Sequence, residues 1–278
     1  MTSSGSPDFD HRRFKQLERA GYNLIAARYA AASALRAELH TALLDAAGLA
    51  GGQEVLDLAS GPGILAAAAL PRVAPGGRVI ASDLAEAMLA ESRGRHPGIM
   101  HAVADGERLP FSSGCFDRVL CGLGLMFLPD EALALAEIRR VLKPGGRVAV
   151  SVWAEAAQVP LVECALACMR RLLPVPKVAR LSVFRLGDPD QLAALLDAAG
   201  FKDIQVEPCE LDCSFKNAED YWQAFLDLAG GAAGSLSRLP AATQAELRSG
   251  VAHELAPYAD AEGYRLVSRV LIATAGRS

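Results

Sequence analysis

Short apolar runs alternate with longer segments of helical periodicity through the middle of the chain. The apolar runs have the length of buried strands and stand at 54–58, 79–82, 99–104, 116–121 and 147–153. The helical segments between them stand at 64–73, 86–95 and 130–141. Strands and helices that alternate at this spacing form βαβ crossovers, so the pattern predicts an α/β fold with a parallel sheet.

Both ends of the chain depart from this alternation. Residues 1–12 are polar and are expected to be disordered, and residues 13–50 carry a helical pattern that Gly21 is expected to divide. After the core, 51–153, the segment 154–278 mixes further strands with helical insertions, which are a natural place for a substrate lid. Four helices are expected in it, at 159–173, 188–199, 218–229 and 241–256, and two strands near 204–213 and 264–274.

Composition excludes several classes of partner. With 278 residues, 51% of them hydrophobic, the chain can form one large α/β domain or a domain with a modest cap. It has 28 basic and 32 acidic residues and no long basic run, so we do not expect it to bind nucleic acid. The apolar run at 64–70 is too short to span a bilayer, and no signal-peptide pattern opens the chain. We expect a cytoplasmic protein without membrane attachment.

The six cysteines are expected to be reduced and mostly buried. None of them forms a C-x-x-C pair, and a zinc site or a disulfide framework would need tighter clustering. No metal ion is therefore expected.

The segment 55–66 is a buried strand that enters a helix through a turn of small residues. Gly61 and Gly63 let the backbone approach a ligand at the helix N-terminus. Asp83 follows the second strand, where a carboxylate grips a ribose diol in such folds. With Asp57, these residues predict a cofactor that contains a nucleoside. The turn also fits the fingerprint G-x-G-x-x-A, so a nicotinamide dinucleotide is the alternative.

Asp105 is placed at the tip of the third strand, on the same edge of the predicted sheet. A carboxylate there can accept a hydrogen bond from an exocyclic amino group such as that of adenine, and the backbone N–H of Gly106 can donate to a ring nitrogen. A solvated acidic turn is the alternative interpretation.

Several ordered stretches resemble the class I S-adenosylmethionine-dependent methyltransferases, and most closely the branch that includes the ubiquinone/menaquinone-biosynthesis enzymes. The stretches are Val55–Gly63, Asp83–Leu84 with Met88, Ala104–Phe111, Phe116–Val119 and Leu142–Arg147. The resemblance covers about residues 20–155 and implies a Rossmann-like fold. That fold has a seven-stranded, mostly parallel sheet with helices on both faces and an antiparallel last strand. The N-terminal helices and the late insertions would form a helical cap.

The resemblance also implies which residues hold the cofactor, S-adenosylmethionine. The turn from Ala59 to Gly63 would cradle its methionine portion, and Asp83 would bind both ribose hydroxyls. The whole implied set is Asp57, Ala59, Ser60, Gly61, Gly63, Asp83, Leu84, Met88, Asp105, Gly106, Glu107 and Cys121. In this set Leu84, Gly106 and Glu107 would border the adenine, and Cys121 would lie near the sulfonium end. Ala59 and Ser60 depart from the family, which usually has glycine and cysteine there.

The acceptor side is less defined by the sequence. In the resembling family the N-terminal helices fold over the cofactor, so Tyr22 and Tyr29 are expected to border the site. Trp153 and Trp222 could wall the acceptor cavity, with ordinary packing as the alternative for all four residues. Methyl transfer needs alignment of the nucleophile, and a base only where a proton must leave. No catalytic residue is assigned: the candidates are Tyr22, Tyr29 and His253, and a solvated face is the favoured interpretation of His253.

The sequence therefore predicts a methyltransferase that transfers a methyl group by in-line displacement to an oxygen, carbon or nitrogen of a small molecule. An NAD(P)-dependent oxidoreductase is the alternative enzyme, although Asp105–Glu107 and Lys143–Gly146 speak against it. A third hypothesis is a cofactor-binding protein on the same fold that does not methylate. The sequence leaves a homodimer open.

Overall fold

The computed structural model describes residues 9–174 and 179–278, so the disorder expected for residues 1–8 lies outside the described residues. The first helix begins at His11. Asp10 caps it, since its carboxylate accepts a hydrogen bond from the backbone N–H of Arg13 at 2.9 Å. Residues 11 and 12 are therefore helical.

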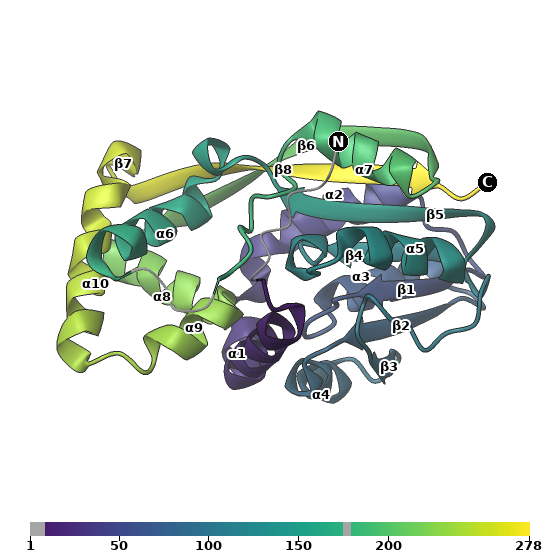
Figure 1. Ribbon diagram of the computed structural model, residues 1–278, viewed down its shortest axis with the longest axis horizontal. Coiled ribbons are helices and arrows are strands. Elements are labelled where there is room, and N and C mark those ends of the chain that lie inside the picture. Colours follow the sequence, from purple (N-terminus) through teal and green to yellow (C-terminus); the bar gives the residue numbers. More distant parts are fainter. Residues whose placement is uncertain (1–8, 175–178) are drawn as a thin grey trace.

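A single sheet runs through the molecule in the order β3-β2-β1-β4-β5-β8-β6 (Figure 1). Strands β1 to β5 are parallel, while β8 pairs antiparallel with both β5 and β6. The strands are β1 (Glu54–Leu58), β2 (Arg78–Asp83), β3 (Met100–Val103), β4 (Phe116–Gly122), β5 (Leu142–Trp153), β6 (Lys202–Phe215), β7 (Ala259–Asp260) and β8 (Gly263–Gly276). The mostly parallel sheet with an antiparallel last strand is confirmed.

The predicted count of seven strands is wrong by one. A two-residue strand, β7, pairs with the beginning of β8 and forms a hairpin with it. The side chain of Asp260 accepts a hydrogen bond from the backbone N–H of Glu262 at 2.8 Å and so stabilises the turn. A strand this short leaves no alternation of polar and apolar residues from which it could be predicted.

Helices cover both faces of the sheet. In Figure 1, α5 and α7 lie in front of it, while α2 and α3 lie behind it. The α-helices are α1 (His11–Ala32), α2 (Ala37–Ala47), α3 (Ile64–Val73), α4 (Glu86–Arg95), α5 (Glu131–Val141), α6 (Pro160–Leu172), α7 (Pro189–Ala198), α8 (Ala218–Leu228), α9 (Gly230–Leu236) and α10 (Ala241–Leu255). Short 3₁₀ turns stand at Ser33–Arg36, Leu125–Phe127, Ala156–Gln158 and Ala256–Tyr258.

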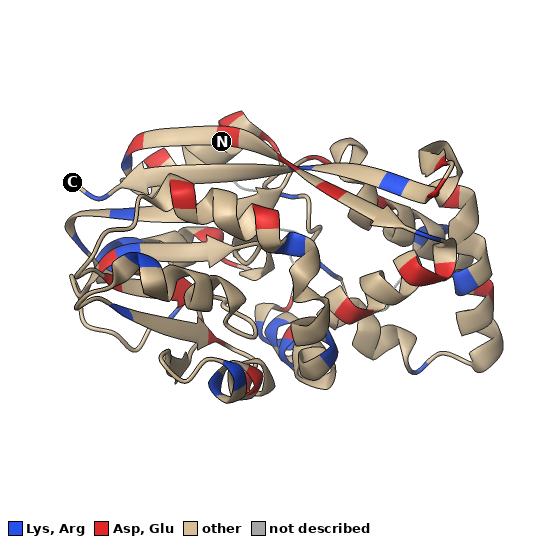
Figure 2. Cartoon of the chain, turned by 180° about the vertical axis from the view of Figure 1, so that it is seen from behind, with Lys and Arg blue, Asp and Glu red and all other residues tan. Residues whose placement is uncertain are grey.

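Strands β6 and β8 extend beyond the sheet and carry a second group of helices. Their pairing runs from Lys202–Gly276 to Phe215–Tyr264, whereas β5 pairs with β8 only from Val270 onward. Around the free half of this ribbon lie α6, α8, α9 and α10 (Figure 1). Three of the four helices expected after Trp153 (α6, α8 and α10) therefore lie in one helical lobe, which packs against α1 through α8 and α9 (Figure 1; seen from behind in Figure 2). The fourth, α7, was expected as an insertion as well, but it packs on β6 and β8 of the sheet.

The prediction that Gly21 divides the first helix is wrong, because α1 continues through it to Ala32. Gly21 instead permits a close helix crossing. A Cβ atom at Gly21 would lie 2.2 Å from the carbonyl oxygen of Gly230 in α9, and one at Gly230 would lie 2.5 Å from the ring of Tyr22. Because Gly21 and Gly230 have no side chains, α9 of the lobe can lie directly against α1.

Replacing Gly21 by leucine is expected to lower the free energy of unfolding by about 1–3 kcal/mol, because the side chain would enter a contact with no free space. The measurement is urea unfolding followed by circular dichroism. Gly94 in α4 is the control: a Cβ atom there meets nothing within 4 Å. Its replacement by alanine is expected to raise the unfolding free energy by roughly 0.5 kcal/mol. Equal effects at the two positions would contradict the close crossing.

All six cysteines are free thiols, and four of them (Cys121, Cys164, Cys168 and Cys213) are buried. Within 9–174 and 179–278, no helix is long and apolar enough to cross a membrane. In the same residues, no three His, Cys, Asp or Glu side chains are grouped so as to hold a metal ion.

Candidate functional site

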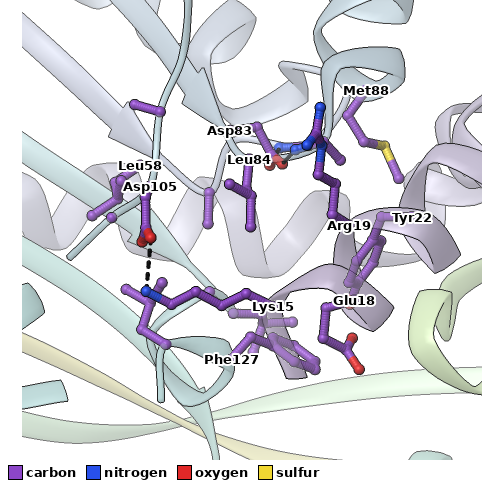
Figure 3. A pocket seen from close by; sticks show the side chains of 18 of the residues that line it. Lys15, Glu18, Arg19, Tyr22, Leu58, Asp83, Leu84, Met88, Asp105 and Phe127 are labelled. Carbon is purple, nitrogen blue, oxygen red and sulfur yellow. Dashed lines mark hydrogen bonds and ion pairs between the residues drawn. The ribbon is translucent and has the colours of Figure 1, made fainter. Parts of the chain in front are cut away.

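A cleft opens at the carboxyl ends of β1, β2 and β4, and α1 lies across it (Figure 3). We call it the nucleoside cleft. Its walls include nine of the residues singled out from the sequence, namely Tyr22, Tyr29, Ala59, Gly61, Asp83, Leu84, Met88, Asp105 and Gly106. Parallel strands place their carboxyl ends at one edge, which explains why residues far apart in the sequence meet here.

Asp83 lines this cleft at the carboxyl end of β2. Its Oδ2 accepts a hydrogen bond from the backbone N–H of Gly61, and its Oδ1 accepts one from that of Ala85, both at 2.8 Å. Burial raises the pKa of Asp83, and these N–H groups counteract the rise. The carboxylate is thus held rigidly against the small-residue turn, with lone pairs left for hydroxyl donors.

The turn after β1 needs residues with small side chains. Gly61 and Gly63 have φ of 53° and 76°, in the left-handed region that glycine adopts freely. A Cβ atom at Gly63 would lie 2.1 Å from Oγ of Ser92, so this glycine serves the packing of the turn on α4. Ala59, which replaces the usual glycine, also has a positive φ of 54° and therefore carries local backbone strain.

Asp105 borders the cleft but is already engaged in an ion pair. Nζ of Lys15, from α1, lies 2.7 Å from Oδ2 of Asp105 and 2.5 Å from Oε2 of Glu107. Glu107 accepts a further hydrogen bond from the backbone N–H of Asp130 at 2.9 Å. It is nearly buried and does not line the cleft, so its place is beneath Asp105 as an anchor for α1.

A small polar recess adjoins the nucleoside cleft at Ala59 and Gly122. Four of the polar side chains that line it come from two regions: Asp57 and Ser60 from β1 and its turn, and Arg36 and His40 from the start of α2. Each of these four has at least one buried polar atom without a hydrogen-bond partner in the described part of the chain. Such atoms are costly unless a ligand or water satisfies them.

Burial determines the ionisation of this polar recess. It raises the pKa of Asp57 to about 8, with the Asp83 carboxylate adding to the rise. Burial and the neighbouring Arg36 lower the pKa of His40 to about 4, so the imidazole is neutral near pH 7.

A larger cavity lies between α1 and the helical lobe. We call it the apolar chamber; it has a volume of about 440 Å³. Leu, Val, Phe, Tyr and Trp side chains from α1, β5, α6 and α8 supply most of its wall, and Trp153 is among them, as the sequence predicted. Its charged groups are Glu18, Arg36, Arg170 and Arg180. Chambers of this size and polarity are typical of sites for small, mainly apolar ligands.

Some candidate residues are not brought to these cavities. Cys121 is fully buried, and burial raises its pKa to about 12, so it is a packing thiol. Trp222 stacks on Phe225 with ring centroids 5.5 Å apart and does not line the apolar chamber, whereas Tyr221 and Phe225 do. The side chain of His253 is 78% exposed on α10 and lies outside both cavities. The solvated face favoured for His253 is what the structure has.

Sequence reasoning missed Lys15, Glu18, Arg36 and His40. The signal for the first two was their spacing with Tyr22 and Tyr29, since steps of three, four and seven residues place all four on one face of α1. Arg36 and His40 are one helical turn apart, a pair that can act together at one end of a ligand.

The comparisons with known proteins agree with this geometry. The sequence model of a family described as "Methyltransferase domain" matches residues 56–150. The demethylmenaquinone methyltransferase of Streptomyces griseus is 34% identical over 163 residues, which cover 55% of this chain and 70% of that enzyme. The chain belongs to the class I S-adenosylmethionine-dependent methyltransferase family.

Other members of the family are similar over shorter or more diverged stretches. The ubiquinone/menaquinone biosynthesis C-methyltransferase UbiE of Bordetella parapertussis is 44% identical over 111 residues, or 38% of this chain. The match spans only 43% of that enzyme's length. Among solved structures, a Haemonchus contortus phosphoethanolamine N-methyltransferase 2 superposes with a TM-score of 0.55 at 21% identity, covering 87% of this chain and 52% of that one. This last likeness supports the fold of the methyltransferase family.

Proposed function

We propose that this methyltransferase-family chain binds S-adenosylmethionine and transfers its methyl group to a small, mainly apolar acceptor. The observation that carries the proposal is the continuity of three cavities. The nucleoside cleft adjoins the polar recess at one end, and it shares a wall with the apolar chamber at the other side.

The residues present fit S-adenosylmethionine. Asp83 and Asp105 offer acceptors for a ribose diol and an amino group, and Leu84 and Met88 offer apolar contacts for a base. The polar recess supplies what a zwitterionic amino acid requires. Asp57 can bind an ammonium group, while Arg36 and Ser60 can donate to a carboxylate. When bound, this cofactor supplies a methyl carbon activated by a positively charged sulfur.

The chain's own contribution to the reaction is alignment and the exclusion of water. Tyr29 and Phe127 border both the nucleoside cleft and the apolar chamber, and α1 covers the junction from outside. An acceptor held in the apolar chamber would therefore lie next to the cofactor, at a junction enclosed by these side chains. Enclosure and orientation are the main requirements of an in-line displacement.

Calorimetric titration with S-adenosylhomocysteine and with NAD⁺ tests the cofactor. We expect S-adenosylhomocysteine to bind with a micromolar Kd, because the polar recess matches its amino-acid end, and we expect no binding of NAD⁺. Binding of NAD⁺ alone would overturn the proposal. Arg36→Met is expected to weaken S-adenosylhomocysteine about 10-fold through the lost charge-assisted hydrogen bond.

A second measurement distinguishes a methyltransferase from a protein that binds this cofactor without methylating. Release of S-adenosylhomocysteine from S-adenosylmethionine in the presence of hydroxylated and amino-substituted aromatic compounds supports transfer. Cofactor affinity without such release would favour the non-methylating hypothesis. A cytoplasmic location and a homodimer belong to the same proposal as predictions, testable by fractionation and by sedimentation.

A further inference from the structure

In the proposed function, the methyl group passes between the nucleoside cleft and the apolar chamber at the wall that the two cavities share. Five side chains line both cavities: Glu18, Tyr22, Tyr29, Leu123 and Phe127. Glu18 is the one carboxylate among them. A proton that leaves an acceptor at this wall therefore has Glu18 as its nearest strong acceptor.

The environment of Glu18 holds its carboxylate in a fixed position. Only 11% of the surface of its side chain is exposed. Its Oε1 accepts a hydrogen bond from Nη1 of Arg180 at 2.7 Å, whereas Oε2 makes none within the described residues. A Cβ atom at Gly231 would lie 2.1 Å from Oε1, so this glycine of α9 is what leaves room for the carboxylate. Figure 3 shows Glu18 beside Tyr22 and Phe127.

On this basis, and resting on the proposed function, we propose that Glu18 accepts the proton of an acidic hydroxyl, a phenol or an enol, on an apolar aromatic acceptor held in the apolar chamber. The O–H bond breaks, its electron pair remains on the acceptor oxygen, and the proton joins Oε2 of Glu18. Arg180 is a positioning residue that fixes Oε1.

The ionisation of Glu18 agrees with this role. Burial raises its pKa, and the charge and hydrogen bond of Arg180 partly offset the rise. A carboxylate in this condition is a better base than an exposed one at neutral pH. The aromatic wall of the apolar chamber explains why the hydroxyl should belong to an aromatic molecule.

Two probes of nearly equal shape test the proposal. They are 2-naphthol, which carries the hydroxyl proton, and 2-methoxynaphthalene, which lacks it. Their affinities are measured by fluorescence titration with S-adenosylhomocysteine present. We expect the wild type to prefer 2-naphthol about 10-fold or more, because its hydroxyl donates to a charged acceptor. In Glu18→Gln this preference is expected to fall to within about 3-fold, while Glu91→Gln, a change at a half-buried residue of α4 that lines neither cavity, leaves it intact.

A double variant tests the role of Glu18 without leaving the charge of Arg180 buried and unpaired. In the double variant Glu18→Leu with Arg180→Leu the ion pair is replaced by apolar groups, so no buried charge is left unpaired. The preference for 2-naphthol is expected to vanish there as well. Persistence of the preference in either variant overturns the role of Glu18, and so does equal or absent binding of the two probes in the wild type. Calorimetry with S-adenosylhomocysteine alone separates this failure from a failure of the proposed cofactor.

Discussion

Replacing Asp83 by asparagine is expected to weaken the binding of S-adenosylhomocysteine about 100-fold, or roughly 3 kcal/mol. The ribose diol would lose one charged acceptor that serves both hydroxyls. The change also disturbs the turn, because the carboxylate accepts the N–H groups of Gly61 and Ala85 at 2.8 Å. Isothermal titration calorimetry measures the affinity directly.

The control for this variant is Asp197→Asn, which removes an exposed carboxylate from α7. It should bind S-adenosylhomocysteine as the wild type does. Circular dichroism must show both variants folded. A change of less than about 3-fold in folded Asp83→Asn would place the ribose elsewhere and would remove the basis for the nucleoside cleft.

Asp57 is expected to make the stability of the unliganded protein fall as the pH rises. Burial raises its pKa from 3.8 to about 8. Between these values the folded state keeps a proton that the unfolded state has lost, so raising the pH favours unfolding. The stabilisation is complete below about pH 4 and is lost as the pH approaches 8. Each pH unit in this window lowers the free energy of unfolding by up to about 1.4 kcal/mol.

Asp57→Asn removes this titration while keeping the shape of the side chain. The difference in unfolding free energy between pH 5 and pH 8 is expected to be smaller in the variant by about 3 kcal/mol. Urea unfolding at each pH measures both proteins. Asp83 and Glu18 also have raised pKa values, so the wild type alone cannot assign the slope, whereas the comparison does. Parallel pH profiles of the two proteins would contradict the buried, unpaired state of Asp57.

The core of the fold was predictable because its signals are local. The first strand, the helix at 64–73 and the helix at 86–95 have the predicted bounds, since an apolar run or a turn residue marks each of their ends. The helix expected at 188–199 begins at Pro189, after Asp188, whose carboxylate accepts hydrogen bonds from the backbone N–H groups of Asp190 and Gln191. The positions of Asp83 and Asp105 at one edge of the sheet were predictable as well, because the carboxyl ends of parallel strands lie at the same edge.

Features set by tertiary packing could not be predicted in this way. Helix α9 has the sequence Gly-Gly-Ala-Ala-Gly-Ser-Leu, whose glycines disfavour a helix. It forms where those glycines allow contact with α1 at Gly21, and neither segment indicates the other. The lobe, the apolar chamber and the role of Glu18 all depend on this contact. The ion pair of Lys15 could not be predicted for the same reason, since its partners Asp105 and Glu107 are distant in sequence.

The ion pair of Lys15 with Asp105 and Glu107 makes α1 a competitor for Asp105, the carboxylate that we propose for an amino group of the cofactor. An incoming amino group must share Asp105 with an ammonium group that is already there. Dissolved salt weakens such a partly exposed pair more than it weakens contacts within the cleft. Moderate ionic strength would then loosen the first turns of α1 and ease the entry of the cofactor, so the affinity of this site is coupled to the ionic composition around it.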